Sequence, residues 1–157
     1  MNKHRAIEII CVVFLVCFIF IISGDGDYSD KTVAEVVDAV STEVDMDIMT
    51  SFKKNKVKQV FGIDLAGVDS VAYYASESVM NVDELLVIKL QQGVKPDGIM
   101  EKIESRVKDK QVLFEGYAPE QSALLKRCSL TYKDGFIFYA VGENATDALV
   151  LFNSIIK

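Results

Sequence analysis

The chain has 157 residues and a formal net charge of −6, because 23 Asp and Glu outnumber 17 Lys and Arg. Both nucleic acid and anionic phospholipid are negatively charged, so neither is expected as the main partner of an acidic chain. The length suits one folded domain, and a hydrophobic content of 50% is enough to build its core.

The N-terminus carries an apolar run that indicates a membrane-directed segment. A basic head with Lys3 and Arg5 precedes an unbroken apolar run from Ile9 to Ile22. A helix that crosses a bilayer takes about 20 residues, whereas the apolar part of a signal peptide takes roughly 7–15. Two interpretations therefore stay open for residues 1–24: a retained single-pass anchor, or a signal peptide that is cleaved.

The position of the positive charges predicts the orientation. Lys3 and Arg5 lie before the apolar run, and positive residues remain on the cytoplasmic side of a membrane. We therefore expect the N-terminus inside and the C-terminal part outside, or secretion of that part after cleavage. The predicted organisation is an anchor or signal segment (residues 1–24), an acidic linker (25–30) and a single extracytoplasmic α+β domain (31–157).

The first signals of folded structure come directly after the linker. Thr32 and Glu35 have the spacing of a capping box, in which each side chain bonds to the backbone of the other residue. Valines at helical spacing follow, which predicts a first helix over Val33–Val44. A second helix is predicted over Met49–Phe61, with Gly62 as its stop.

The rest of the chain alternates between strand and helix signals. Pro96 suits the first turn of a helix, and Asn144 is a typical N-cap. The pair Asp134-Gly135 predicts a tight hairpin. In chain order we expect strands at Ser70–Ala75 and Glu84–Leu90, a helix from Pro96 to Phe114, a short helical turn at Tyr117–Gln121, strands at Arg127–Tyr132 and Phe136–Val141 joined at Lys133-Asp134-Gly135, and a final helix after Asn144.

This order predicts the fold class. Two strand–strand–helix units follow two helices, so we expect an α+β domain in which the units form one four-stranded antiparallel sheet. The strands Glu84–Leu90 and Phe136–Val141 are apolar on both faces, unlike strands of a sheet with one wet side. Both faces must therefore be covered. Either the N-terminal helices cover the second face, or a partner or ligand does.

No catalytic constellation is visible in the sequence. The only histidine, His4, precedes the apolar run, and neither a nucleophile elbow nor a phosphate loop occurs. Carboxylate catalysis needs two acids across a cleft. The chain has so many acidic residues that the four candidates for such a catalytic pair carry little weight: Glu77, Asp83, Glu84 and Glu115. We therefore expect a protein without enzymatic activity, cofactor or metal site.

Cys128 is the only cysteine beyond the N-terminal segment, because Cys11 and Cys17 lie in the apolar run. A disulfide within the outer domain is therefore excluded. Cys128 alternates with Leu130 and Tyr132 on a predicted strand, so we expect a buried, unreactive thiol.

Several short segments carry a family resemblance: Asp83–Leu90, the helix ending at Phe114, Tyr117–Gln121, the Gly135 turn and the final helix through Phe152. With them, the stretch from Val71 to Phe152 resembles an uncharacterised bacterial domain of unknown function that is common in envelope proteins of Gram-positive bacteria. Members carry an N-terminal membrane or lipoprotein signal. Here Val16 stands before Cys17, where a lipid-modified cysteine usually follows a small residue, so the chain departs from the lipoprotein members. The resemblance implies an envelope location and no known activity.

These observations favour a membrane-tethered extracytoplasmic binding or interaction module of unknown ligand. Its expected partners are the membrane, through the N-terminal segment, and an envelope protein or small ligand. The alternative is a structural accessory subunit of a membrane or cell-envelope complex, and a carboxylate-dependent hydrolase comes third. The candidate binding residues are one acid and three aromatics: Tyr74, Glu84, Tyr117 and Tyr139. Tyr117 is also expected to pack against the core.

Overall fold

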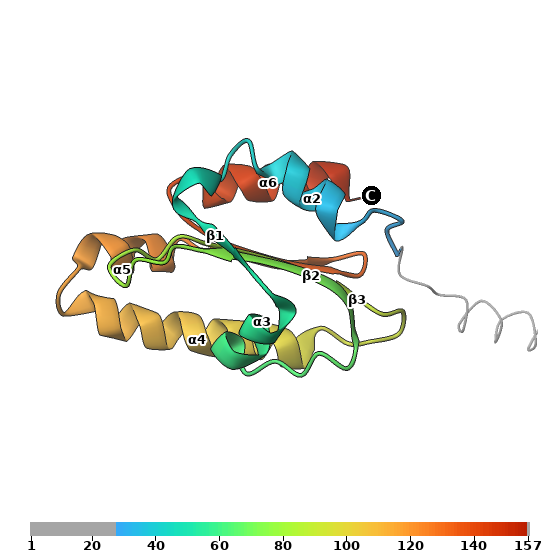
Figure 1. Cartoon of the computed structure of the whole chain (residues 1–157), viewed down its shortest axis with the longest axis horizontal. Coiled ribbons are helices and arrows are strands. Elements are labelled where there is room, and N and C mark those ends of the chain that lie inside the picture. The colour runs from blue at the N-terminus through green and yellow to red at the C-terminus, as the bar shows by residue number, and fades with distance from the viewer. Residues whose placement is uncertain (1–27, 157) are drawn as a thin grey trace, which may run out of the picture.

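The computed structural model describes residues 28–156, which form a five-stranded antiparallel sheet between two layers of helices (Figure 1). The strand order is β1-β2-β3-β5-β4. Helices α2 and α6 lie on one face of the sheet, and α3, α4 and α5 lie on the other. The elements in chain order are α2 (Val33–Val40), a short 3-10 helix η1 (Met46–Ile48), β1 (Thr50–Phe52), α3 (Lys54–Phe61), β2 (Val68–Ala75), β3 (Glu84–Leu90), α4 (Asp97–Glu115), α5 (Pro119–Lys126), β4 (Ser129–Lys133), β5 (Phe136–Val141) and α6 (Ala145–Ile155).

The α+β class and the antiparallel sheet are confirmed, but the prediction of four strands is wrong. The segment predicted as one helix, Met49–Phe61, contains β1 followed by the shorter α3. Thr50 pairs with Ala75, and Phe52 pairs with Tyr73, whose ring lies 5.6 Å from that of Phe52. Without β1, this end of β2 would present unpaired backbone groups. Pairing therefore overrides the helical pattern of the segment.

Two predicted helix boundaries are confirmed. The Thr32 hydroxyl accepts a hydrogen bond from the Glu35 N–H at 3.2 Å, and the Glu35 carboxylate accepts one from the Thr32 N–H at 2.8 Å. Gly62 ends α3 in the left-handed conformation, with φ 64°. Such a φ is strained for residues that carry a Cβ, so a glycine at this stop is expected.

The first helix is about one turn shorter than predicted, because α2 ends at Val40. The Ser41 hydroxyl donates to the carbonyl oxygen of Asp38 at 2.6 Å, and the Thr42 hydroxyl donates to that of Ala39 at 3.2 Å. Local bonds of this kind compete with continuation of a helix. The valine spacing continues beyond Val40, but the backbone does not follow it.

Both faces of the sheet are covered by the chain's own helices, as the two-sided apolar strands required. Leu85 and Phe138 enter the core under α2 and α6, where the Phe138 ring stacks on Phe152 with centroids 4.8 Å apart. Leu86 and Tyr139 enter the core under α3, α4 and α5. The N-terminal helices divide between the faces, α2 on one and α3 on the other. The expectation that both cover the same face is therefore wrong.

The N-terminal end of the folded part is fixed beside the β4–β5 turn. The Ser29 N–H donates to the carbonyl oxygen of Asp134 at 3.0 Å. Asp134 (φ 48°) and Gly135 (φ 88°) are left-handed, as a tight Asp-Gly hairpin requires. A Cβ at Gly135 would lie 2.5 Å from the Tyr28 ring. Glycine is therefore required there both by the turn and by this contact.

The predicted membrane segment (residues 1–24) and the first three residues of the predicted linker lie outside the described residues. Between residues 28 and 156, no helix is long and apolar enough to cross a membrane. The anchor, the cleaved signal and the membrane orientation accordingly stay predictions from the sequence.

Cys128 lies just before β4, at the edge of the core beneath α4. It is half-buried rather than fully buried. Burial, and then the negative charge of Glu104, raises the pKa of its thiol above the ordinary value. The low reactivity expected of this thiol stays a prediction.

Candidate functional site

Glu84, the first residue of β3, has only 3% of its surface exposed and is the only fully buried charged residue among residues 28–156. It lies beside Ala75 of β2 and Val141 of β5 in the register of the sheet. Its side chain lies on the face that α4 covers. A carboxylate in such a position must be paired and hydrogen-bonded, because its burial is otherwise very unfavourable.

Four hydrogen bonds meet the Glu84 carboxylate. The guanidinium of Arg106 donates to Oε1 at 2.5 Å and to Oε2 at 2.7 Å. The Tyr73 hydroxyl donates to Oε1 at 2.9 Å, and the Tyr139 hydroxyl donates to Oε2 at 3.0 Å. The ammonium nitrogen of Lys110 lies 3.5 Å from Oε1. We refer to these five residues as the Glu84 cluster.

Sheet register and helical spacing bring the cluster together. Tyr73 and Tyr139 both pair with Leu86, one from β2 and the other from β5, so the two rings lie on the same face on either side of β3. Arg106 and Lys110 are four residues apart on α4, which places them on one side of that helix. The helix itself is held on the sheet by its buried residues, Ile103, Val107 and Phe114.

The electrostatics keep the cluster in one protonation state. Burial alone would raise the pKa of Glu84, but the hydrogen bonds and charge of Arg106, with the charge of Lys110, bring it below its ordinary value. Burial, and then the negative charge of Glu84, raises the pKa of Tyr73 and of Tyr139. At neutral pH the cluster therefore holds an ionised carboxylate and two protonated phenols.

A cavity of about 570 Å³ opens beside the Glu84 cluster. Tyr73, Glu84, Arg106 and Lys110 line its buried part. Its rim includes three exposed apolar side chains, Val79 between β2 and β3 at 84%, Leu113 of α4 at 61% and Tyr117 at 51%, beside charged ones such as Lys56 and Glu77. This volume lies in the range of sites that bind small molecules, and the cavity combines fixed polar groups with exposed apolar side chains.

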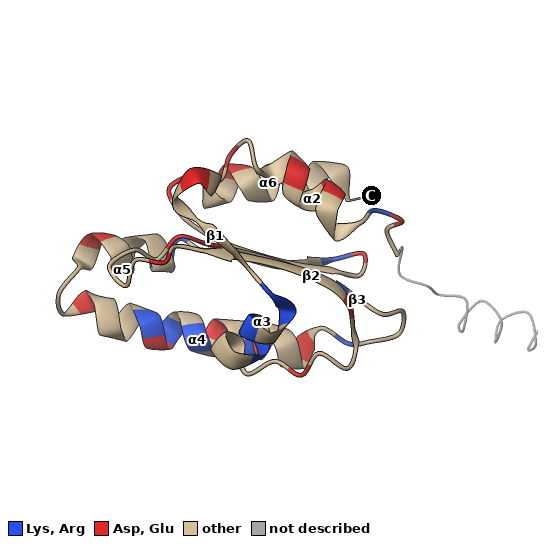
Figure 2. Ribbon diagram, in the orientation of Figure 1, with Lys and Arg blue, Asp and Glu red and all other residues tan. Residues whose placement is uncertain are grey.

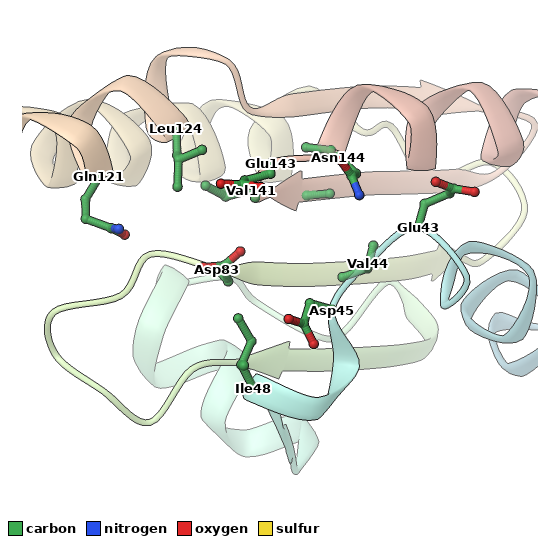
Figure 3. Close-up of a pocket in the computed structure, with 13 residues that line it drawn as sticks. Glu43, Val44, Asp45, Ile48, Asp83, Gln121, Leu124, Val141, Glu143 and Asn144 are labelled. Carbon is green, nitrogen blue, oxygen red and sulfur yellow. The ribbon is translucent and has the colours of Figure 1, made fainter.

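A second hollow, of about 410 Å³, is acidic (Figure 3). Its carboxylates belong to Glu43, Asp45, Asp83 and Glu143, and Asp83 also lines the first cavity. Burial raises the pKa of Asp83, and the charges of Asp45 and Glu143 act in the same direction. In the part of the chain that the structure describes, no group of three or more His, Cys, Asp or Glu side chains is placed to hold a metal ion.

The four candidate residues from the sequence lie in different surroundings. Glu84 and Tyr139 meet in the cluster, and both are buried. Tyr117 lies at the cavity rim, where its ring is 5.1 Å from that of Phe114, and its exposure shows that the expected packing into the core is wrong. Tyr74 lies on the opposite face of the sheet, half-buried beside α2. The structure thus places Glu84 and Tyr117 at one cavity, with Tyr139 buried behind Glu84, and separates Tyr74 from them.

Arg106, Lys110 and Tyr73 were not among the candidate binding residues predicted from the sequence. The basic pair had a recognisable signal, because two cations four residues apart share a face with the buried Ile103 and Val107. Tyr73 had none, since its role depends on which residue of β3 lies opposite.

Comparison with family models places this site in a sequence family. The model of a domain of unknown function, DUF4358, matches residues 30–142, which is more than half of the chain. The chain belongs to the DUF4358 family. The DUF4358 match runs from just before α2 to just after β5, so it contains every residue of the Glu84 cluster. The resemblance to an uncharacterised domain is confirmed, although the match begins well before Val71. No curated protein and no solved structure was found to match the chain.

Proposed function

We propose that this DUF4358 protein is a membrane-tethered extracytoplasmic binding module that holds its ligand in the cavity beside the Glu84 cluster. The tether and the outward orientation are supported by the apolar run from Ile9 to Ile22 and by the basic residues before it. The resemblance to envelope proteins of Gram-positive bacteria supports the same location.

The main observation that supports a binding function is the cavity itself. Its polar part is held rigid, because the Glu84 carboxylate is fixed from two strands and one helix. Its rim exposes Val79, Leu113 and Tyr117 within one small area. Exposed apolar side chains that gather around a hollow are a mark of binding sites.

The protonation of the cluster favours binding over acid–base catalysis. A general acid or base works best when its pKa is close to the working pH. Here the pKa of Glu84 is lowered, and the pKa values of Tyr73 and Tyr139 are raised, so all three move away from neutrality. The cluster is suited to presenting fixed charge and hydrogen-bond donors.

Binding at the cavity is tested by a matched pair of variants. Leu113→Asp places a charge on the cavity rim, whereas Val150→Asp makes the same change on α6 at nearly equal exposure, 62% against 61%. A panel of small organic compounds is screened by thermal shift against the full-length chain in lipid nanodiscs. We expect the compounds that stabilise the wild type to stabilise Val150→Asp and not Leu113→Asp. An absence of hits, or equal effects in the two variants, would contradict the proposal.

The orientation needs its own experiment. A reporter enzyme that is active only outside the cytoplasm, fused after Lys157, should be active in a bacterial host. An inactive fusion that accumulates to the same level would contradict the outward orientation. If Leu113→Asp instead removes a co-purifying membrane protein and no compound binds the wild type, the structural accessory subunit is the better interpretation.

A further inference from the structure

We infer that the cavity beside the Glu84 cluster takes an organic monocarboxylate, with the carboxylate on the Lys110 ammonium and an apolar arm along Leu113 and Tyr117. This inference rests on the proposed binding function and names the class of its ligand. Three features of the cavity lead to it: the second positive charge beside the single Glu84 carboxylate, the surrounding carboxylates and the exposed apolar side chains of the rim.

Lys110 is the second cation on the single carboxylate of Glu84, which it meets in a longer ion pair than Arg106 does. A carboxylate has about four lone-pair positions, and on Glu84 all four are taken by the two guanidinium bonds and the two phenols. The Lys110 nitrogen, 3.5 Å from Oε1, lies beyond the usual N–H···O range of about 2.7–3.2 Å. Arg106 uses both arms of its guanidinium on Glu84, so Arg106 and Lys110 together leave one positive charge that the single Glu84 carboxylate does not balance.

The burial of Lys110 makes an anionic ligand favourable. Only 20% of its side chain is exposed. Burial is also the largest influence on its pKa, which is lowered. An ammonium with so little access to water is stabilised by a bound anion, because the anion replaces hydration that the site withholds.

The charges around the cavity favour a ligand with a single negative charge. Glu77 and Asp83 line the same cavity and would repel a dianion. Lys56, the third cation of the lining, is exposed at the rim with its ammonium 5.7 Å from the Phe52 ring centroid. One carboxylate balances the one excess positive charge of the Glu84 cluster, whereas a doubly charged phosphate would exceed it.

The rim requires an apolar part on the same ligand. Leu113 and Tyr117 lie at the end of α4 and just beyond it, and Val79 lies in the β2–β3 connection. An inorganic anion would leave these three side chains in water. A carboxylate that carries an aryl or alkyl chain covers them, and the cavity of about 570 Å³ has room for both parts.

The test compares three probes on the full-length chain in phosphatidylcholine nanodiscs. The probes are 4-phenylbutanoate, its uncharged amide 4-phenylbutanamide, and inorganic phosphate, each titrated calorimetrically with empty nanodiscs as the blank. We expect the acid to bind at least about tenfold more tightly than the amide, as for loss of one charge-assisted hydrogen bond. We expect phosphate neither to bind at the cavity nor to displace the acid.

Variants of α4 locate the carboxylate. Lys110→Met removes the charge and leaves the Glu84–Arg106 pair, and Lys108→Met makes the same change at an exposed position of the same helix. We expect the first variant to weaken binding of 4-phenylbutanoate at least about tenfold and the second to leave it unchanged. Lys110→Arg should retain binding. The acid–amide comparison on the wild type needs no variant, so it holds even if Lys110→Met folds poorly.

The outcomes separate this inference from the proposed function. If the amide binds as tightly as the acid and Leu113→Asp abolishes both, the cavity binds ligands but the monocarboxylate class is wrong. Displacement of the acid by phosphate would also overturn the class. If neither organic probe binds and the compound panel gives no hit, the proposed function fails together with the inference.

Discussion

The two faces of the sheet are built from different chemistry. Helices α2 and α6 contain no lysine or arginine, whereas α3 and α4 carry bands of basic residues (Figure 2). The core under α2 and α6 is aliphatic and aromatic, with Phe138 stacked on Phe152. The core under α4 encloses the Glu84 cluster and leads into the cavity.

This difference shows where the fold departs from the simplest stable arrangement. A buried ion pair gives little net stability, since well-packed apolar residues of the same volume do as well or better. The face under α2 and α6 shows that this chain can cover its sheet with apolar residues alone. This contrast supports the proposal that the charges under α4 serve a binding site.

The largest expected effect comes from Glu84→Ala. The change leaves Arg106 and Lys110 buried without their anion, so we expect a loss of about 3–5 kcal/mol in the free energy of unfolding. Phe152→Ala, on the other face, should cause a similar loss of about 3–5 kcal/mol through a cavity. Urea unfolding of both variants measures this, and a loss below about 1 kcal/mol for Glu84→Ala would contradict the burial of the cluster.

The pH dependence of stability should distinguish the two faces. The folded pKa of Glu84 is lowered, so its contribution is fully present above the unfolded pKa and is lost as the pH falls through the folded pKa. The difference in unfolding free energy between the wild type and Glu84→Gln should therefore shrink as the pH is lowered from about 7 to about 3. The difference between the wild type and Phe152→Ala should stay constant. Parallel curves for the wild type and Glu84→Gln would contradict the lowered pKa.

A smaller effect is expected from Tyr139→Phe. The change removes one donor from a buried carboxylate and keeps the ring in place, which should reduce the free energy of unfolding by about 1–3 kcal/mol. Tyr132→Phe removes a hydroxyl at a site with 41% exposure and serves as the control, with an effect within about 0.5 kcal/mol. Equal effects in chemical denaturation would mean that the Tyr139 hydroxyl is not a working donor.

The smallest effect on stability is expected from Tyr117→Ala. Half of this side chain is exposed and its main contact is the Phe114 ring, so the loss should stay below about 1 kcal/mol. Binding of 4-phenylbutanoate should nevertheless weaken, because the rim loses an aromatic wall. A loss of more than about 2 kcal/mol in urea unfolding would restore the view that Tyr117 belongs to the core.

Most of the fold was readable from local patterns. The capping box of Thr32 and Glu35, the two-sided apolar strands and the Asp134-Gly135 hairpin each depend on neighbours in sequence, and the structure contains all of them. β1 was missed because three residues are too few to show alternation and because its pairing depends on the distant β2. The end of α2 was misplaced because the valine spacing continued past the residues that end the helix.

The site was readable only in part, because its members are far apart in sequence. Tyr73, Arg106 and Tyr139 are 11, 22 and 55 residues from Glu84. A buried glutamate at the start of an apolar strand suggests an unidentified partner, and the helical spacing of Arg106 and Lys110 suggests a shared face. No local sequence pattern connects Glu84 with Arg106 and Lys110, because the position of α4 over β3 depends on the packing of the whole sheet.

The contact between Tyr28 and Gly135 determines which end of the sheet lies near the N-terminal segment. The β4–β5 turn lies at the Leu90 end of β3, where the Leu90 N–H donates to the Gly135 carbonyl oxygen at 2.8 Å, and the cavity lies at the Glu84 end. A strand of this length spans about 20 Å. If residues 1–24 stay in the bilayer as proposed, β3 would separate the cavity from the tether by the length of the strand.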